Sequence, residues 1–297
     1  MSAPACAPVG ASSPPRGSLA GETTVPLTTI EFAGHRYVAD AELDAGGRAR
    51  LMIHGNASMF LMLTHEIGER VNGGPVPKQA DYGYSAKGKG SVRVGGLRLA
   101  GRSIADIPEV PVFDYVAEGA SPAQGMLGVP FLARERAAVD FARDVMILGV
   151  RTGARPDRGL LDRGYRSVAM IPDATGKLFV EAYFPSLGRT IPLTPSTVSS
   201  ALTLHRPPFV GRLPMLRDTT DTDHSPSRTH PALYRSERVA FSIGGAAFES
   251  PASLEDFAEY ANRPETDLES LGYLGYDWMK AHAAVIDYAN RVLYFRP

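Results

Sequence analysis

One histidine follows a short apolar run and is itself followed by small polar residues. The run from Ala49 to Ile53 leads into His54, and Gly55, Asn56 and Ser58 come next. Imidazole titrates near neutral pH, so a histidine at the floor of a binding site can exchange protons with a bound substrate. A histidine in such a place can equally do no more than hydrogen-bond neighbouring backbone. Both interpretations stay open, and His54 is the candidate catalytic residue.

A second polar group follows another short apolar run. Thr190 to Leu193 leads into Thr194, Pro195 and Ser196. No GxSxG elbow surrounds Ser196, so a serine-hydrolase nucleophile has no local support. Buried hydroxyl groups need hydrogen-bond partners, so these side chains are expected to bond within the protein or to water, or to bind a ligand.

Two other segments with potentially catalytic or metal-binding side chains do not match a known motif in full. His65 and Glu66 begin like a zinc-protease HExxH helix but lack the second histidine, which predicts only a short helix. The polar insertion at 206–236 holds acidic and histidine residues without a standard metal-loop spacing. Those residues are Asp218, Asp221, Asp223, His224 and His230. The sequence therefore predicts neither a metal site nor a cofactor.

The composition narrows the class of protein. The 297 residues are 44% hydrophobic and include 30 Gly and 24 Pro, which indicates a globular chain with many turns. The net charge of -1 gives no electrostatic case for nucleic acid or an anionic membrane. The one cysteine, Cys6, excludes an intrachain disulfide and favours a reducing, cytoplasmic location. No run of about 18 apolar residues is present to span a bilayer.

The elements that must position these residues repeat along the chain. Residues 125–148 match 272–295 at a constant offset of 147, and seven of the 24 aligned pairs are identical. Both copies begin with Gly-apolar-apolar-Gly and reach an aspartate, Asp140 or Asp287, in a closing turn. Upstream of each copy, alternating residues and Gly-containing turns predict hairpins. The pattern predicts an all-β protein with short helices, built by duplication.

The spacing divides the chain into four parts. Residues 1–24 are expected to be a disordered leader, 25–150 the first lobe, 151–166 a linker and 167–297 the second lobe. Asp173, Ala, Thr and Gly176 lie between two strand patterns, which predicts a hairpin turn there. Since two lobes already lie in one chain, the predicted state is a monomer.

Over residues 25–297 this pattern resembles the pepsin and retropepsin clan of aspartic proteases. The likeness lies in the apolar strand that runs into a loop ending in Ala57 and Ser58, a flap-like segment from Asp81, and the element at 125–128. It implies two related β lobes around a central cleft. The same alignment puts His54 and Thr194 where that clan has its two catalytic aspartates, so both acids are substituted. Paired carboxylates sharing one proton activate water in such sites, and this chain supplies neither. Acid proteolysis by that route is not expected.

The resemblance also implies which residues line the cleft. Asn56, Ser58, Thr194 and Ser196 are expected near His54 as substrate-binding residues. Tyr82 and Tyr84 lie in the glycine-rich flap segment with Gly83, Gly88 and Gly90, where a tyrosine covers the substrate of the resembled clan. An exposed hairpin is the plainer interpretation of the same residues.

Three functions follow as hypotheses. The first is a non-proteolytic enzyme that performs isomerisation, elimination or cyclisation, with His54 as general acid or base on a small carbonyl-containing or peptide-like substrate. The second is a pseudoprotease that binds a peptide or protein segment in the cleft without chemistry. The third is an atypical peptidase, for which the spacing offers no nucleophile and base pair.

Overall fold

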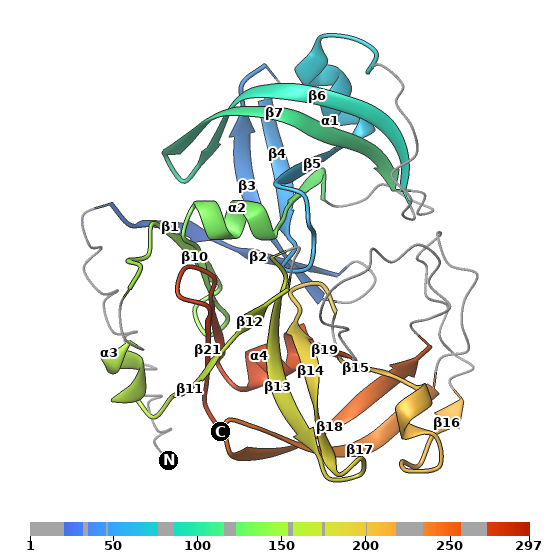
Figure 1. Cartoon of the computed structure of the whole chain (residues 1–297). Coiled ribbons are helices and arrows are strands. Elements are labelled where there is room, and N and C mark those ends of the chain that lie inside the picture. The colour runs from blue at the N-terminus through green and yellow to red at the C-terminus, as the bar shows by residue number, and fades with distance from the viewer. Residues whose placement is uncertain are drawn as a thin grey trace, which may run out of the picture.

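The structure of the chain is a computed structural model (Figure 1). It describes residues 21–31, 35–45, 47–76, 86–115, 123–153, 157–173, 176–199, 201–217, 234–256 and 272–297.

The first half of the chain forms a seven-stranded sheet, in the upper part of Figure 1. Its strand order is β2-β3-β4-β8-β5-β7-β6, in which β4 and β8 run parallel. Helices α1 and α2 follow β5 and β8. The elements are β2 (Thr28–Glu31), β3 (His35–Leu43), β4 (Gly47–Ile53), β5 (Leu61–Thr64), α1 (His65–Asn72), β6 (Ala86–Leu99), β7 (Arg102–Tyr115), β8 (Gly125–Leu127) and α2 (Val129–Arg134).

The second half forms an eight-stranded sheet, in the lower part of the figure. Its order is β12-β13-β14-β19-β15-β18-β17-β16, and β14 and β19 again run parallel. The elements are β12 (Ile171–Pro172), β13 (Leu178–Phe184), β14 (Arg189–Pro195), β15 (Leu202–His205), η1 (Pro207–Phe209), β16 (Leu216–Arg217), β17 (Tyr234–Ile243), β18 (Ala246–Glu255), β19 (Gly272–Leu274) and α4 (Tyr276–Ala281).

Apart from the additional edge strand β16, these two sheets have the same strand order. Each strand from β2 to β8 has a counterpart at the same position of the second sheet, and α2 and α4 both follow the short central strand. The predicted all-β fold of two related lobes with short helices is therefore confirmed.

A third sheet of six strands joins the lobes. Its order is β1-β10-β9-β20-β21-β11, so the two halves of the repeat meet where β9 pairs with β20. Asp140 pairs with Val285 and Ala138 with Asp287, which is the symmetric register that a duplication predicts. The strands are β1 (Thr23–Pro26), β9 (Ala138–Asp140), β10 (Val145–Leu148), β11 (Arg166–Ala169), β20 (Val285–Asp287) and β21 (Val292–Phe295).

The repeated glycines are explained by close backbone approach. A Cβ on Gly125 would lie 2.4 Å from the carbonyl oxygen of Met62, and one on Gly272 would lie 2.6 Å from that of Thr203. Those carbonyls belong to the neighbouring strands β5 and β15. A side chain at either position would push the central strand out of its sheet, because the core around it is densely packed.

Three expectations need correction or comment. Thr23 and Thr24, placed in the leader by the sequence, belong to β1. Gly88 and Gly90 do not form a hairpin tip: they lie within β6, on either side of an irregularity in its pairing with β7. Glycine suits such a bulge because it has no side chain to pack. Helix α3 (Arg158–Leu161) lies within the predicted linker.

In the part of the chain that the structure describes, no helix is both long and apolar enough to cross a membrane.

Candidate functional site

The two lobes present matching positions at the ends of β4 and β14. The backbone N–H of His54 donates to the carbonyl of Leu127 at 2.9 Å, and that of Ser196 donates to Leu274 at 2.9 Å. Leu127 and Leu274 are 147 residues apart, the offset of the repeat. Ser196, not Thr194, is therefore the counterpart of His54, and the alignment of Thr194 with His54 is wrong.

The error has a physical origin in the length of β14. The sequence placed the end of this strand at Leu193, but pairing with β19 continues it through Thr194 and Pro195. Proline lacks an N–H, but the parallel-strand bond to Leu274 is donated by the next residue, Ser196, just as His54 donates to Leu127 in the first lobe. Strand β14 thus ends two residues later than the sequence indicated.

His54 and Ser196 accept equivalent hydrogen bonds. Nδ1 of His54 accepts from the backbone N–H of Asn56 at 3.3 Å, and Oγ of Ser196 accepts from that of Val198 at 3.3 Å. Because Nδ1 is an acceptor, the ring proton of a neutral imidazole lies on Nε2. Among the residues that the structure describes, none accepts a hydrogen bond from that Nε2–H.

Electrostatics keep this imidazole neutral. His54 is half-buried, and loss of solvation together with the charges of Arg36 and Lys177 lowers the pKa of His54 to about 3. The side chain is therefore uncharged at neutral pH and does not titrate there, contrary to the expectation from sequence. In this state it is a hydrogen-bond donor through Nε2.

A threonine that the sequence did not indicate joins the loop after β4, which begins at His54, to the loop after β14, which begins at Ser196. Oγ1 of Thr197 donates to the carbonyl of Ile53 at 2.7 Å and accepts from the N–H of Gly55 at 2.9 Å. Thr197 is fully buried, so each of these bonds replaces one that water would otherwise make. The signal in the sequence was its place directly after Ser196, once Ser196 is aligned with His54.

The counterpart of Thr197 in the first lobe is Gly55, and a tyrosine from the other half fills its space. A Cβ at position 55 would lie 2.5 Å from Oη of Tyr288. Tyr288 is buried, and its hydroxyl makes no hydrogen bond with the described residues. Burial also raises the pKa of Tyr288, so this hydroxyl stays protonated. The fit between Gly55 and Tyr288 holds the His54 loop against the second half of the chain.

The amide of Asn56 is positioned between the loops. Its Nδ2 lies 3.4 Å from Oγ of Ser196, and its Oδ1 is buried without a partner among the described residues. Ser196 Oγ already accepts from the N–H groups of Val198 and Ser199, which uses both of its lone pairs. Its own proton must then be donated, and the amide oxygen is the acceptor within reach. Rotating the amide by 180° allows this bond and places the NH₂ group at the unpartnered position.

The remaining predicted site residues lie in different surroundings. Ser58 is exposed beyond the His54 loop, whereas Thr194 and Ser196 are buried. Tyr82 and Tyr84 lie outside the described residues, as do the acidic and histidine residues of the 206–236 insertion that were weighed as metal ligands. Within the described ranges, no group of three or more histidine, cysteine or acidic side chains is arranged to hold a metal ion.

Several structural interpretations from the sequence are confirmed. Asp173 forms a turn, with Gly176 N–H bonded to its carbonyl at 3.0 Å, between the paired strands β12 and β13. Asp140 and Asp287 accept backbone N–H bonds within the two closing turns. His65 begins α1 and pairs with Glu69 at 3.1 Å.

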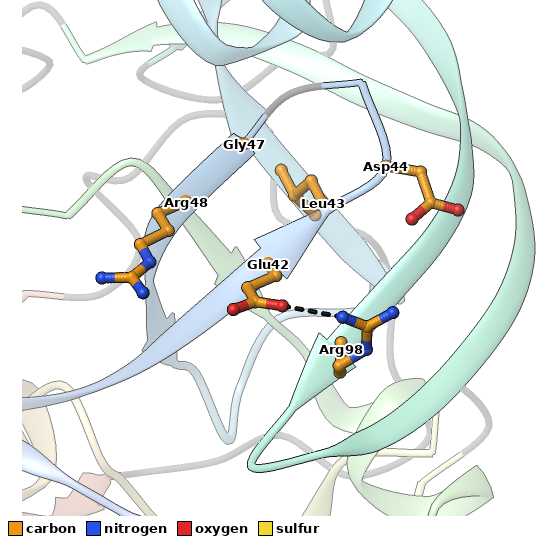
Figure 2. Close-up of a pocket in the computed structure, with 6 residues that line it drawn as sticks. All are labelled: Glu42, Leu43, Asp44, Gly47, Arg48 and Arg98. Carbon is orange, nitrogen blue, oxygen red and sulfur yellow. Dashed lines mark hydrogen bonds and ion pairs between the residues drawn. The ribbon is translucent and has the colours of Figure 1, made fainter.

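A shallow pocket lies elsewhere, at the turn between β3 and β4 (Figure 2). Glu42 and Arg98 join across it by an ion pair of 2.9 Å. Both side chains are about half exposed, which leaves the pair screened by solvent. The pocket adds no titratable group to the His54 site.

Of the comparisons with known proteins, only the one with solved structures finds a similarity. No family model matches the chain, and no curated protein matches it significantly. Among solved structures, the chain is similar to the aspartic proteinase from Irpex lacteus, with 12% identity and a TM-score of 0.49. The match covers 93% of this chain and 97% of that one.

Proposed function

We propose that this chain is a binding protein that holds a peptide-like ligand between its two lobes and does not hydrolyse it. The observation that carries the proposal is the pair of matching strand ends, which present a neutral imidazole at His54 and a hydroxyl at Ser196. In the resembled protease clan these would be the positions of the two catalytic aspartates.

The side chains at this position support binding better than hydrolysis. Water activation of the aspartic-protease type needs two carboxylates about 3 Å apart that share one proton. His54 and Ser196 carry no negative charge, and the Ser196 hydroxyl is buried and bonded to its own loop. His54 Nε2–H is a donor suited to a ligand carbonyl. An extended segment recognised through its main chain presents such carbonyls at regular intervals.

A proton-transfer enzyme is the second candidate, and one observation favours it. Nε2 of His54 has no partner among the described residues, so a substrate atom is free to meet it. A pKa of about 3 makes this imidazole a weak base, which limits the driving force for proton abstraction at neutral pH. Isomerisation, elimination or cyclisation through His54 therefore ranks second. The chain is proposed to act as a monomer, since both lobes of the site come from one chain.

The experiment uses a pool of random hexapeptides with acetylated and amidated ends. Equilibrium dialysis against the full chain at pH 7, read by mass spectrometry, measures binding, and incubation at pH 3, 5 and 7 measures chemical change. We expect a subset of peptides to be retained and recovered intact. His54→Ala should weaken their binding about fivefold, the equivalent of roughly 1 kcal/mol for one neutral hydrogen bond.

The matched control is His65→Ala, because His65 pairs with Glu69 on α1 and not with the site. Cleavage of the pool at acid pH would overturn the proposal. Uncleaved peptides that change their chromatographic retention or mass, with the change lost in His54→Ala, would select the proton-transfer enzyme instead.

A further inference from the structure

The two matching loops of the site differ in what they leave open to a ligand. Nε2 of His54 has no partner among the described residues, yet it is not one of the buried polar atoms that lack a partner. Since His54 is only half-buried, its Nε2 therefore reaches the surface of the protein. Ser196, by contrast, has no exposed surface. One loop presents a polar atom, and the other encloses its own.

The oxygen of Ser196 is fully used within the protein. It accepts the backbone N–H groups of Val198 at 3.3 Å and of Ser199 at 3.0 Å. The side-chain amide of Asn56 lies 3.4 Å away and makes the third contact. A hydroxyl has two lone pairs and one proton, so these three partners leave it nothing to offer a ligand.

The imidazole of His54 can bond to a ligand in one direction only. Its Nδ1 accepts the backbone N–H of Asn56, which leaves the ring proton on Nε2. Nε2–H is a donor, so a ligand atom that meets it must be an acceptor. A ligand N–H placed there would lose its hydrogen bond with water and gain none in return.

We propose that the ligand is held at this point by one carbonyl oxygen, bonded to Nε2–H of His54, and that Ser196 makes no contact with it. The inference rests on the proposed function and adds the chemical class of the ligand. Neither side chain has an acceptor left for an N–H, so the carbonyl of an ester, a lactone or a ketone fits as well as that of an amide. His54 is then the specificity-determining residue, and Ser196 closes its own loop.

NMR of the ring nitrogens tests the donor state without any ligand. In the full chain labelled with ¹⁵N-histidine at pH 7, His54 should show a proton on Nε2 and none on Nδ1. His54→Leu identifies its signals by their loss. A proton on Nδ1 alone overturns the inference, because Nε2 would then accept a hydrogen bond.

The class of ligand is tested on a hexapeptide that the chain retains in the equilibrium dialysis. Each of its peptide bonds is replaced in turn by an ester, which keeps the carbonyl and removes the N–H, or by a trans-alkene, which removes both. At one bond we expect the ester to bind within about threefold of the amide and the alkene about fivefold more weakly, as for the loss of one neutral hydrogen bond. Equal losses for ester and alkene at every bond overturn the inference.

Two variants identify the protein group that meets this carbonyl. In His54→Leu the alkene should bind as well as the amide, since the donor is gone. In Ser196→Ala the alkene should still cost about fivefold. If Ser196→Ala abolishes that cost, the hydroxyl is the contact and the inference fails. Ser196→Cys keeps the size of the side chain and replaces Ser196→Ala if that variant does not fold. His65→Leu is the matched control, because His65 pairs with Glu69 on α1.

The two proposals fail in different ways. If hexapeptides are retained but no peptide bond couples to His54→Leu, the binding function stands and the inference fails. If none is retained, the peptide-binding function fails, and N,N-dimethylacetamide, a carbonyl compound without an N–H, is titrated instead. A saturable shift of the His54 Nε2 resonance that persists in Ser196→Ala upholds the carbonyl site for a small ligand, and no shift overturns it.

Discussion

At the scale of single residues, His54 shows how surroundings change chemistry. Imidazole in water is half-protonated near pH 6.5. Here burial and the nearby charges of Arg36 and Lys177 lower its pKa to about 3, and the backbone N–H of Asn56 occupies Nδ1. The residue that looked most like a general base is held as a neutral donor.

This state of His54 predicts a pH dependence of stability. Below pH 6.5 the unfolded chain gains a proton on His54 that the folded chain does not bind until about pH 3. Folding free energy is therefore lost as pH falls through this window, with a slope of about 1.4 kcal/mol per pH unit from this group. His54→Gln should remove that part of the slope in urea denaturation between pH 6.5 and 4.

Exposed His35 provides the control for this measurement. His35→Gln should leave the acid loss between pH 6.5 and 4 in place. If the wild type and His54→Gln show parallel curves over this range, His54 is protonated normally in the folded state and its neutrality is disproved.

At the scale of elements, two loops depend on each other across the lobes. Thr197 bonds to Ile53 and Gly55, while Tyr288, directly after β20, occupies the space of a side chain at position 55. The His54 loop is thus held by two hydroxyl groups of the second half: that of Thr197, which is fully bonded, and that of Tyr288, which makes no bond with the described residues. The second is a cost, since a buried hydroxyl without a partner loses its hydration.

Removing that hydroxyl should therefore not destabilise the protein. Tyr288→Phe is expected to be neutral or to stabilise by about 1 kcal/mol, because a buried unpaired polar group is replaced by apolar surface. Gly55→Ala should destabilise by about 1–3 kcal/mol, as overpacking does, and the cost should shrink in the double variant. The free energies of unfolding of the four proteins form a double-mutant cycle. Additive costs would show that Gly55 and Tyr288 do not meet.

At the scale of the whole molecule, a polar cluster joins the two halves away from the site. Lys280 of α4 donates to Asp144 and to the carbonyl of Phe141, and Tyr37 of β3 donates to the same carboxylate. Burial raises the pKa of Asp144, but the hydrogen bonds from Lys280 and Tyr37 outweigh it and hold that pKa below its usual value. The cluster fixes α4 of the second half to the turn between β9 and β10 of the first.

A lowered carboxyl pKa gives stability that is present at neutral pH and is lost as pH falls through the folded-state value. Lys280→Met should therefore lower the free energy of unfolding by about 0.5–1 kcal/mol at pH 7, the range for a partly exposed pair, and by less at pH 3. Arg93→Met is the control, because Arg93 and Asp106 pair in the exposed hairpin of β6 and β7. An equal loss at both pH values would exclude an ionic role for Lys280.

The duplication could be recognised in the sequence because short-range structural constraints preserve its repeated residues. Gly125 and Gly272 each face a carbonyl oxygen of a neighbouring strand, and the turns of Asp140 and Asp287 bond within a few residues. Such constraints repeat at a constant offset, so strand content, two related lobes and His54 at a strand end followed from the sequence. The core glycines and the closing turns can be recognised without knowing which distant segments of the chain they contact.

Only the tertiary structure determined which residues of the two lobes correspond to each other. Strand β14 ends at Pro195 because β19, about eighty residues later, pairs with it that far, and this makes Ser196 the counterpart of His54. Thr197 likewise meets Ile53 and Gly55 only because the two lobes pack together. A strand's end and register are set by its partner strand, whereas the alternation and turns that identify a strand lie within it.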